Sequence, residues 1–375
     1  MRHPIGGRRV ALAMLAGLAT IALGGCSDGG DEDPPSSVPR SFFGVVPQTA
    51  LAEQDLDRMG QGEVGTMRLV VFWSALDPTP KRGDVNLEGI DGIVLGAARN
   101  GIDVLPTVFS TPTWVARDLD RSACDEDCGL LAPRSGAALD AWSDFVGRLA
   151  DRYGPDGKLW AEHPDVEPRP IRAWQIWNEQ NSPTFYQPEP DVGAYERLLA
   201  ASSDAIHEQD PDATIITGGM LGTPFKGERP AYSAWDFLRR LYEIPGAEDE
   251  FDGVGAHPYA AHMKKVRSQV RRIREEIARA GDDATIWVTE VGWASSGPDV
   301  PLNRGPEGQA EALTEAFDFL LAKRVDWRIE TVTWYSWRDS AEPVCAWCQG
   351  SGLFRRRALE PKPSWDAFVA FTGGT

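Results

Sequence analysis

Two glutamates follow directly on short apolar runs of the sequence. Glu179 lies in the segment 177–181 (WNEQN), and Glu290 lies in the segment 289–293 (TEVGW). Two opposed carboxyls can cleave a glycosidic bond, because the protonated one gives its proton to the leaving oxygen while the ionised one attacks the carbon. Their pKa values must then differ, which burial beside aromatic surface and donated hydrogen bonds can achieve. The pair is a candidate catalytic site provided that the fold brings the two side chains together.

Eight short apolar runs bounded by turn-forming residues predict the strands of that fold. They cover residues 42–46, 67–72, 104–109, 173–177, 214–217, 253–256, 285–289 and 331–336. Between these runs, apolar residues recur at spacings of three and four, which is typical of the buried face of a helix. The predicted helices cover residues 49–59, 87–100, 137–153, 192–208, 233–242, 262–280, 308–323 and 364–371.

Strands that are separated by helices pair in parallel, so this order predicts an α/β fold. Eight such units without a composition break indicate a single-domain (β/α)8 TIM barrel over residues 41–375. A doubly wound open sheet is the alternative, but no glycine-rich phosphate loop follows an early strand, so a nucleotide-binding version has no support. In a barrel, Glu179 and Glu290 end the fourth and seventh strands and face each other across the mouth.

The segments around both glutamates resemble those of clan A glycoside hydrolases, the retaining (β/α)8 enzymes that include cellulases, mannanases and β-xylosidases. The resemblance extends over residues 41–373, and the cellulase-like or β-xylosidase-like branch is the nearest in character. It implies that Glu179 is the acid/base and Glu290 the nucleophile. The sequence departs from the pattern at Gln180 and Asn181, where many relatives carry a proline, and the loops that hold cysteines match no substrate-defining motif.

The same resemblance assigns roles to other residues at the predicted strand ends. Asn178 would bind the sugar 2-hydroxyl, Arg68 and Tyr259 would donate hydrogen bonds to the nucleophile, and His257 would line the mouth. Trp334 and Trp337 would form a platform under the sugar at the cleavage point.

Fourteen tryptophans are a high count for this length. Trp142, Trp235 and Trp365 fall on predicted helices, where core packing explains them. Seven others lie at strand ends or in the loops beyond, where aromatic faces could stack on sugar rings: Trp73, Trp114, Trp177, Trp293, Trp334, Trp337 and Trp347. Of these, Trp73 and Trp293 join Trp334 and Trp337 as predicted substrate-binding residues. Roughly half of the seven are expected to contact ligand, and filling of the barrel's top layer is the alternative for the rest.

The first 25 residues read as a signal peptide, with arginines before an apolar run that is too short to span a bilayer. The run ends in small residues before Cys26, which resembles a bacterial lipobox in which that cysteine is lipidated. An ordinary secretory signal is the alternative, and Arg8-Arg9 gives weak support to a twin-arginine signal. Residues 26–40 are acidic and rich in Pro and Gly, as expected of a disordered tether. We therefore expect an extracytoplasmic protein anchored to the cell membrane.

Four further cysteines form an even set, which in an exported protein suggests disulfides: Cys124, Cys128, Cys345 and Cys348. Three pairings are possible, and the local Cys124–Cys128 and Cys345–Cys348 bridges are the simplest. A four-thiolate zinc site is the rival interpretation, but an oxidising compartment disfavours it. His257 and His262 lack a metal-ligand pattern, so we predict no metal and no cofactor.

The formal charge of −18 repels phosphate backbones, so nucleic-acid binding is a poor hypothesis. The predicted partner is a carbohydrate substrate, a β-linked poly- or oligosaccharide whose glycosidic bonds are cleaved. The protein is expected to be a monomer. A glycan-binding lipoprotein without catalysis and a transglycosylase that uses the same residues are the alternatives. The intact glutamate pair argues against the first, and the sequence cannot separate the second from a hydrolase.

Overall fold

The computed structural model describes residues 37–79, 85–119, 128–134, 136–223, 227, 230–341, 345–357 and 359–375. The predicted signal peptide, Cys26, most of the tether and Cys124 lie outside these ranges. Pro39–Thr375 forms one compact unit. Among the described residues, no helix has the length and apolar character needed to cross a membrane.

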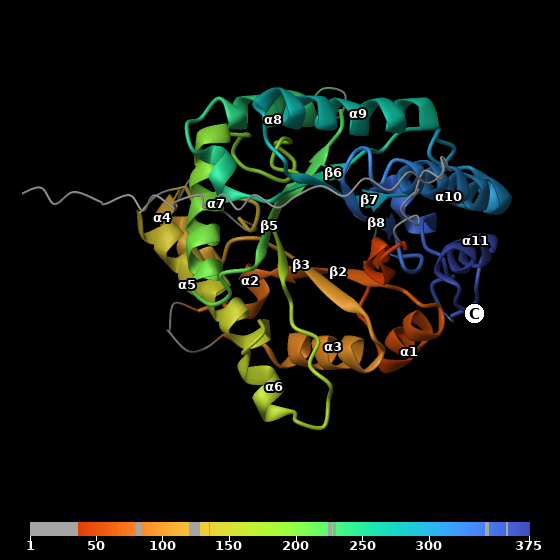
Figure 1. Cartoon of the computed structure of the whole chain (residues 1–375), viewed down its shortest axis with the longest axis horizontal. Coiled ribbons are helices and arrows are strands. Elements are labelled where there is room, and N and C mark those ends of the chain that lie inside the picture. The colour runs from red at the N-terminus through yellow and green to blue at the C-terminus, as the bar shows by residue number, and fades with distance from the viewer. Residues whose placement is uncertain are drawn as a thin grey trace, which may run out of the picture. The chain divides into compact units, whose positions relative to one another are not determined.

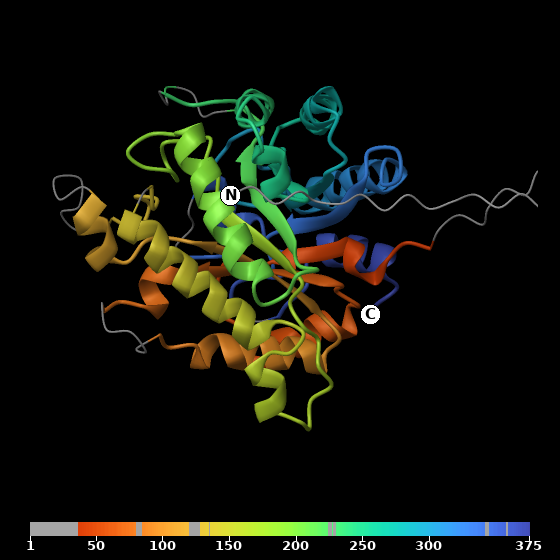
Figure 2. The ribbon, with the colours of Figure 1, turned by 60° about the vertical axis from the view of Figure 1, so that its left-hand side comes forward.

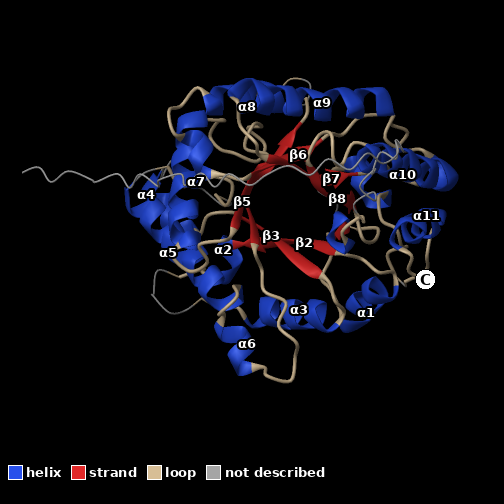
Figure 3. Ribbon diagram, viewed as in Figure 1, coloured by secondary structure: helices blue, strands red, loops and turns tan. Residues whose placement is uncertain are grey.

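Eight parallel strands close into a barrel in sequence order, with β1 paired to both β2 and β8. Figure 3 shows them as a central ring inside the helices. The strands are β1 (Phe43–Val46), β2 (Thr66–Phe72), β3 (Asp103–Phe109), β4 (Ala173–Asn178), β5 (Thr214–Leu221), β6 (Gly253–His257), β7 (Thr285–Val291) and β8 (Ile329–Tyr335). The predicted (β/α)8 barrel is confirmed, and each predicted strand lies within a few residues of an observed one.

Helices surround the barrel and return the chain from each strand to the next (Figure 1). The α-helices are α1 (Glu53–Gln61), α2 (Trp73–Leu76), α3 (Glu88–Arg99), α4 (Thr113–Leu119), α5 (Gly136–Tyr153), α6 (Lys158–Glu162), α7 (Val192–His207), α8 (Ala234–Tyr242), α9 (Met263–Ala280), α10 (Gly305–Ala322) and α11 (Pro363–Thr372). Short 3-10 helices span Arg40–Phe42, Ala247–Glu250 and Ala346–Gly350. The sequence patterns missed α2, α4 and α6, which are too short to show a helical period.

Local signals explain where several helices begin and end. The side chains of Asp191 and Ser233 accept hydrogen bonds from the backbone at the starts of α7 and α8. Helix α9 ends at Gly281, whose φ of 77° is left-handed and costs glycine little. Helix α5 buries Trp142 and Phe145 against the barrel, as its apolar spacing predicts.

Both ends of the described barrel contact the C-terminal end of α1 and the turn that follows it. The backbone nitrogen of Thr375 donates to the carbonyl of Gln61 at 3.0 Å, and Arg40 pairs with Glu63 at 2.9 Å. In Figures 1 and 2 the C-terminus lies on the outside of the barrel after α11. The last helix thus covers the junction between the first and last parts of the barrel.

Candidate active site

A cavity opens at the C-terminal ends of the strands, where the sequence places the glutamates. Both Glu179 and Glu290 line it, together with Arg68, Asn178 and Tyr259. The remaining described residues in its wall are Gln48, Val70, Phe72, Phe109, Thr184, Phe185, Leu221, Leu302, Tyr335, Cys345, Trp347 and Cys348. The structure therefore brings five of the ten predicted catalytic and substrate-binding residues into one cavity, from strands far apart in the sequence.

Glu290 accepts a hydrogen bond on each carboxylate oxygen. Arg68 donates to Oε1 at 2.6 Å, and the hydroxyl of Tyr259 donates to Oε2 at 2.7 Å. Burial raises the pKa of Glu290 above the ordinary value of a glutamate, while the charge of Arg68 and the two hydrogen bonds oppose that rise. Arg68 is itself 1% exposed and also donates to Asn178 Oδ1 at 2.9 Å. Arg68 and Tyr259 thus stabilise the ionised form of Glu290, whereas burial of the carboxyl favours its protonated form.

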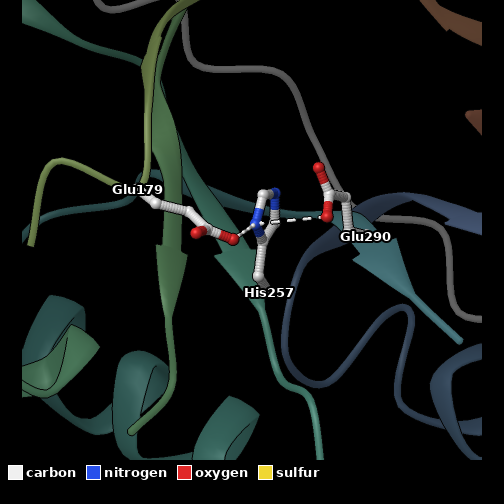
Figure 4. A group of neighbouring side chains, drawn as sticks. All are labelled: Glu179, His257 and Glu290. Atoms are coloured by element: carbon white, nitrogen blue, oxygen red, sulfur yellow. Dashed lines mark hydrogen bonds and ion pairs between the residues drawn. The ribbon is translucent and has the colours of Figure 1, made fainter. Parts of the chain in front are cut away.

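Glu179 has different partners, although it lies close to Glu290. His257 stands between the two carboxylates in Figure 4, with its Nδ1 2.8 Å from Glu179 Oε1 and 3.6 Å from Glu290 Oε2. One carboxylate oxygen of each glutamate and a ring nitrogen of His257 all lie within 4.8 Å of one another. The two carboxyls are therefore near enough to act on one bond, and Glu290 is paired with an arginine.

A buried chain of hydrogen bonds links the two glutamates and includes both ring nitrogens of His257. Gln175 Oε1 must accept from Arg68 Nε (2.7 Å), so its Nε2 faces Thr289 and donates to that hydroxyl oxygen at 3.0 Å. We assign the Thr289 hydroxyl as the donor to His257 Nε2, 3.1 Å away. This assignment leaves the ring proton on Nδ1, 2.8 Å from Glu179 Oε1. Burial and the charge of Arg68 lower the pKa of His257 well below its ordinary value, so the ring is neutral.

The backbone that carries Glu179 is held in an unusual conformation. Trp177 and Glu179 have φ values of 69° and 47°, in the left-handed region that side chains larger than glycine rarely adopt. The side chain of Asn181 ties this segment to β5 through Leu221, donating to its carbonyl at 2.8 Å and accepting from its nitrogen at 3.1 Å. A further bond from Asn181 reaches the carbonyl of Tyr232 at 2.8 Å. Asn181, which the sequence marked only as a departure from the clan pattern, thus positions the acid/base candidate.

The four tryptophans predicted to bind substrate are in the interior instead. At most 1% of each side chain is exposed, and none is among the described residues in the cavity wall: Trp73, Trp293, Trp334 and Trp337. Their indole nitrogens have internal acceptors; Trp334 donates to the carbonyl of Ser351 at 3.1 Å and Trp337 to Asp55 at 2.9 Å. The structure corrects this prediction, because these rings pack between the barrel and its helices.

The cavity wall also contains aromatic residues outside the predicted substrate-binding set, among them Tyr335 and Trp347. Tyr335 follows Trp334 on β8 and points to the opposite side, because successive side chains of a strand alternate. Trp347 lies in the loop after β8, with its ring centroid 5.2 Å from that of Tyr259 and 6.0 Å from that of Tyr335. Strand alternation could have pointed to Tyr335, and Trp347 was already among the seven tryptophans that the sequence placed near the barrel mouth.

The Cys345–Cys348 disulfide is present, with Trp347 inside its four-residue loop. Cys128 is disulfide-bonded as well, whereas its predicted partner Cys124 lies outside the described residues. The local bridge in the loop after β8 is therefore confirmed, and it forms part of the cavity wall beside Trp347.

Glu179, His257 and Glu290 also have the residue types of a metal site. Both oxygens of Glu290 already accept hydrogen bonds, and the nitrogen of His257 that faces the glutamates carries a proton by the argument above. A metal-bound histidine must present a lone pair instead. The group fits proton transfer better than cation binding.

Comparison with known proteins identifies relatives by structure alone. No protein-family model matches the chain, and no curated protein matches it. A family 39 glycoside hydrolase from Bacteroides cellulosilyticus WH2 aligns with a TM-score of 0.61 at 20% identity, over 89% of this chain and 63% of that one. This chain thus spans less than two thirds of that enzyme.

Two further solved structures align over larger shares of their own length. The intracellular xylanase TsXylA from Thermoanaerobacterium saccharolyticum gives a TM-score of 0.59 at 16% identity, over 90% of this chain and 99% of that one. A monomeric β-xylosidase from Caulobacter crescentus CB15 gives 0.59 at 18% identity, over 88% and 68%. The chain therefore has the (β/α)8 fold of the clan A glycoside hydrolases that are its solved structural neighbours.

Proposed function

We propose that the chain is a retaining glycoside hydrolase that cleaves a β-linked poly- or oligosaccharide. The observation that carries the proposal is the approach of Glu179 and Glu290 carboxylate oxygens to within 4.8 Å in one cavity, with Arg68 and Tyr259 donating to Glu290. Retaining enzymes hold their carboxyl groups about 5–5.5 Å apart, whereas inverting enzymes leave about 6.5–9.5 Å for a water molecule. The short separation supports retention.

In the first step, a Glu290 oxygen attacks the anomeric carbon while the bond to the leaving oxygen breaks. Glu179 gives its proton to that oxygen, and a covalent glycosyl-enzyme forms. In the second step, Glu179 takes a proton from water, whose oxygen attacks the same carbon and releases Glu290. Arg68 and Tyr259 hold the Glu290 charge before attack and receive it again afterwards.

The proposed substrate is supported by the chemistry of the neighbours and of the cavity. A xylanase and a β-xylosidase are among the solved structures with this fold. Tyr259, Tyr335 and Trp347 place aromatic rings in the wall near Glu290, where they can pack against the C–H face of a sugar. Asn178 lies beside both carboxyls and can bind the 2-hydroxyl.

The test assigns each glutamate by chemical rescue. Glu290→Ala and Glu179→Ala are assayed on nitrophenyl β-glycosides of glucose, xylose, mannose and galactose, with and without azide. Glu290→Ala should lose activity and form the inverted glycosyl azide, since azide replaces the nucleophile on the opposite face. Glu179→Ala should form the retained azide, since azide then attacks the glycosyl-enzyme.

Glu315→Ala is the matched control, because that glutamate is exposed and pairs only with Arg267 in the described contacts. It should keep full activity. Undiminished turnover by Glu290→Ala would sink the proposed mechanism. Product analysis with an oligosaccharide acceptor would separate hydrolysis from transglycosylation.

We also propose that the chain is exported and anchored through lipidated Cys26. The disulfide between Cys345 and Cys348 supports export, because such bonds persist in oxidising compartments. Labelling with a fatty-acid analogue in a bacterial host should mark the wild type and not Cys26→Ala, and the variant should leave the membrane fraction. Equal labelling of both proteins would contradict this assignment.

A further inference from the structure

The cavity wall contains a group of apolar side chains in addition to the polar groups that contact Glu290. The polar groups are those around Glu290: Arg68, Tyr259 and Tyr335, with Asn178 beside them. Four apolar side chains come from the ends of β2, β3 and β5 and from the loop after β4, where Thr184 also lines the wall: Phe72, Phe109, Leu221 and Phe185. Strands β3 and β5 flank β4, which leads into Glu179.

The barrel register keeps the apolar residues together. Phe72 is opposite Phe109 across the β2–β3 pair, and their ring centroids are 5.0 Å apart. Phe109 contacts Trp177 on β4 with a centroid separation of 5.9 Å. Leu221 is bound through its backbone to Asn181, two residues after Glu179. The apolar wall, defined as Phe72, Phe109, Phe185 and Leu221, is therefore built around the acid/base candidate.

Phe72 is an unusual residue in this wall because 47% of it is exposed. Only two other large apolar residues, Val38 and Val325, are exposed among the residues that the structure describes. Phe109 covers part of the Phe72 ring, and the rest of that ring faces the cavity. An apolar ligand would remove that surface from water, which is favourable in proportion to its area.

The mechanism decides which part of a substrate meets this wall. Glu179 protonates the leaving oxygen, so the leaving group lies on its side of the cavity. A sugar in that place needs partners for its hydroxyls, since unpaired polar groups are costly to bury. The side chains of Phe72, Phe109, Phe185 and Leu221 offer neither donors nor acceptors.

We infer that the leaving-group subsite accepts an apolar aglycone, so that the substrate is a β-glycoside whose sugar is joined to an alkyl or aryl group. This inference rests on the proposed function and narrows it. The sugar occupies the polar side, between Glu290, Asn178 and Tyr335, and the aglycone occupies the apolar wall beside Glu179.

The test compares leaving groups on one sugar. Methyl, butyl, hexyl and octyl β-glycosides of glucose, xylose, mannose and galactose are assayed beside cellobiose, xylobiose and mannobiose, with phenyl glycosides as the aryl arm. For the preferred sugar, kcat/KM should rise by up to about fourfold for each methylene that the wall buries, then level off. A preference for octyl over phenyl compounds would indicate a lipid-like aglycone, and the reverse an aromatic one.

Substitutions in the apolar wall test whether it causes the dependence of kcat/KM on alkyl length. Phe72→Ala and Leu221→Asn should flatten the dependence of kcat/KM on alkyl length. Val325→Ala is the matched control, because Val325 is also exposed but is absent from the cavity lining, and it should leave the dependence intact. Binding of octyl β-thioglycosides, measured by calorimetry, gives a readout that does not depend on turnover.

The outcomes separate this inference from the proposed function. If disaccharides are hydrolysed well and octyl glycosides are no better than methyl glycosides, the wall stacks on a second sugar and the inference is wrong, although the chain is still a glycosidase. If no compound is hydrolysed and no thioglycoside binds, both fail. Binding without hydrolysis leaves the apolar subsite standing and overturns the proposed function.

Discussion

Arg68 and Tyr259 set the charge of Glu290, and each can be tested through the pH dependence of activity. Burial alone raises the pKa of Glu290, and the two donors limit that rise. Activity needs ionised Glu290, so it should fall as the pH drops through this pKa.

Tyr259→Phe removes the donor to Oε2 of Glu290 and keeps the ring. The ionised form loses stabilisation, so the pKa of Glu290 rises and the acidic limb of kcat/KM moves to higher pH. A shift of up to about one unit is expected for one hydrogen bond to a charged group, at 1.36 kcal/mol per unit. The measurement is the pH profile of both proteins on one nitrophenyl glycoside, and a shift to lower pH would contradict the assignment.

Thr289→Val removes the hydroxyl that donates to His257 Nε2. The Nδ1–H tautomer loses its support, and Gln175 Nε2 loses an acceptor, so unfolding should become easier by about 1–3 kcal/mol. We expect kcat to fall, and the 15N shifts of His257 should show a different tautomer. Thr289→Ser keeps the hydroxyl and should restore both; an unchanged tautomer in Thr289→Val would show that the chain does not fix it.

Among the elements, the β4 end depends most on its surroundings. Asn181→Ala removes three hydrogen bonds that tie the Glu179 segment to β5 and to the loop before α8. The free energy of unfolding should fall by about 1–3 kcal/mol, and kcat should fall more than KM changes, because Glu179 loses its fixed position. Asn100→Ala, at the end of α3, is the control: it costs stability without a change in kcat.

The elements also show what could be predicted and what could not. The eight strands and the two glutamates followed from apolar runs and strand ends. The direction of individual side chains did not, because strands of a parallel barrel are buried on both sides and show no alternation of polarity. Trp334 and Tyr335 are both suitable for either side, and only packing of Trp334 against Phe317, at 6.5 Å between centroids, shows which one faces outward.

Loop residues were harder still. Trp347 reaches the cavity because its loop folds back over Tyr259 and Tyr335, a contact between segments far apart in the sequence. The tryptophan count was a real signal of aromatic packing, but most of these rings stabilise the barrel rather than bind a sugar. Strands and helices can be predicted from the local sequence, whereas the residues of the cavity wall depend on how these elements pack against one another.

For the whole molecule, α11 is the element that joins the two ends of the barrel. Trp365 is 2% exposed, stacks on Phe368 at 5.9 Å and contacts Trp337 at 5.6 Å. Trp365→Ala should lower the free energy of unfolding by about 3–5 kcal/mol, because it leaves a large cavity there. Chemical denaturation measures the loss, and Val325→Ala should show almost none; a small effect at Trp365 would mean that α11 adds little to closure.

Residues 40 and 375 both contact the region around the end of α1, so the barrel should tolerate circular permutation. Arg40 pairs with Glu63, and Thr375 is bonded to Gln61 only two residues away. A short glycine-serine linker could join these ends, and new ones could be opened in the exposed stretch between α6 and β4. Such a circular permutant would keep every strand pair and both glutamates in place, so the barrel could be started from a different strand without rebuilding its mouth.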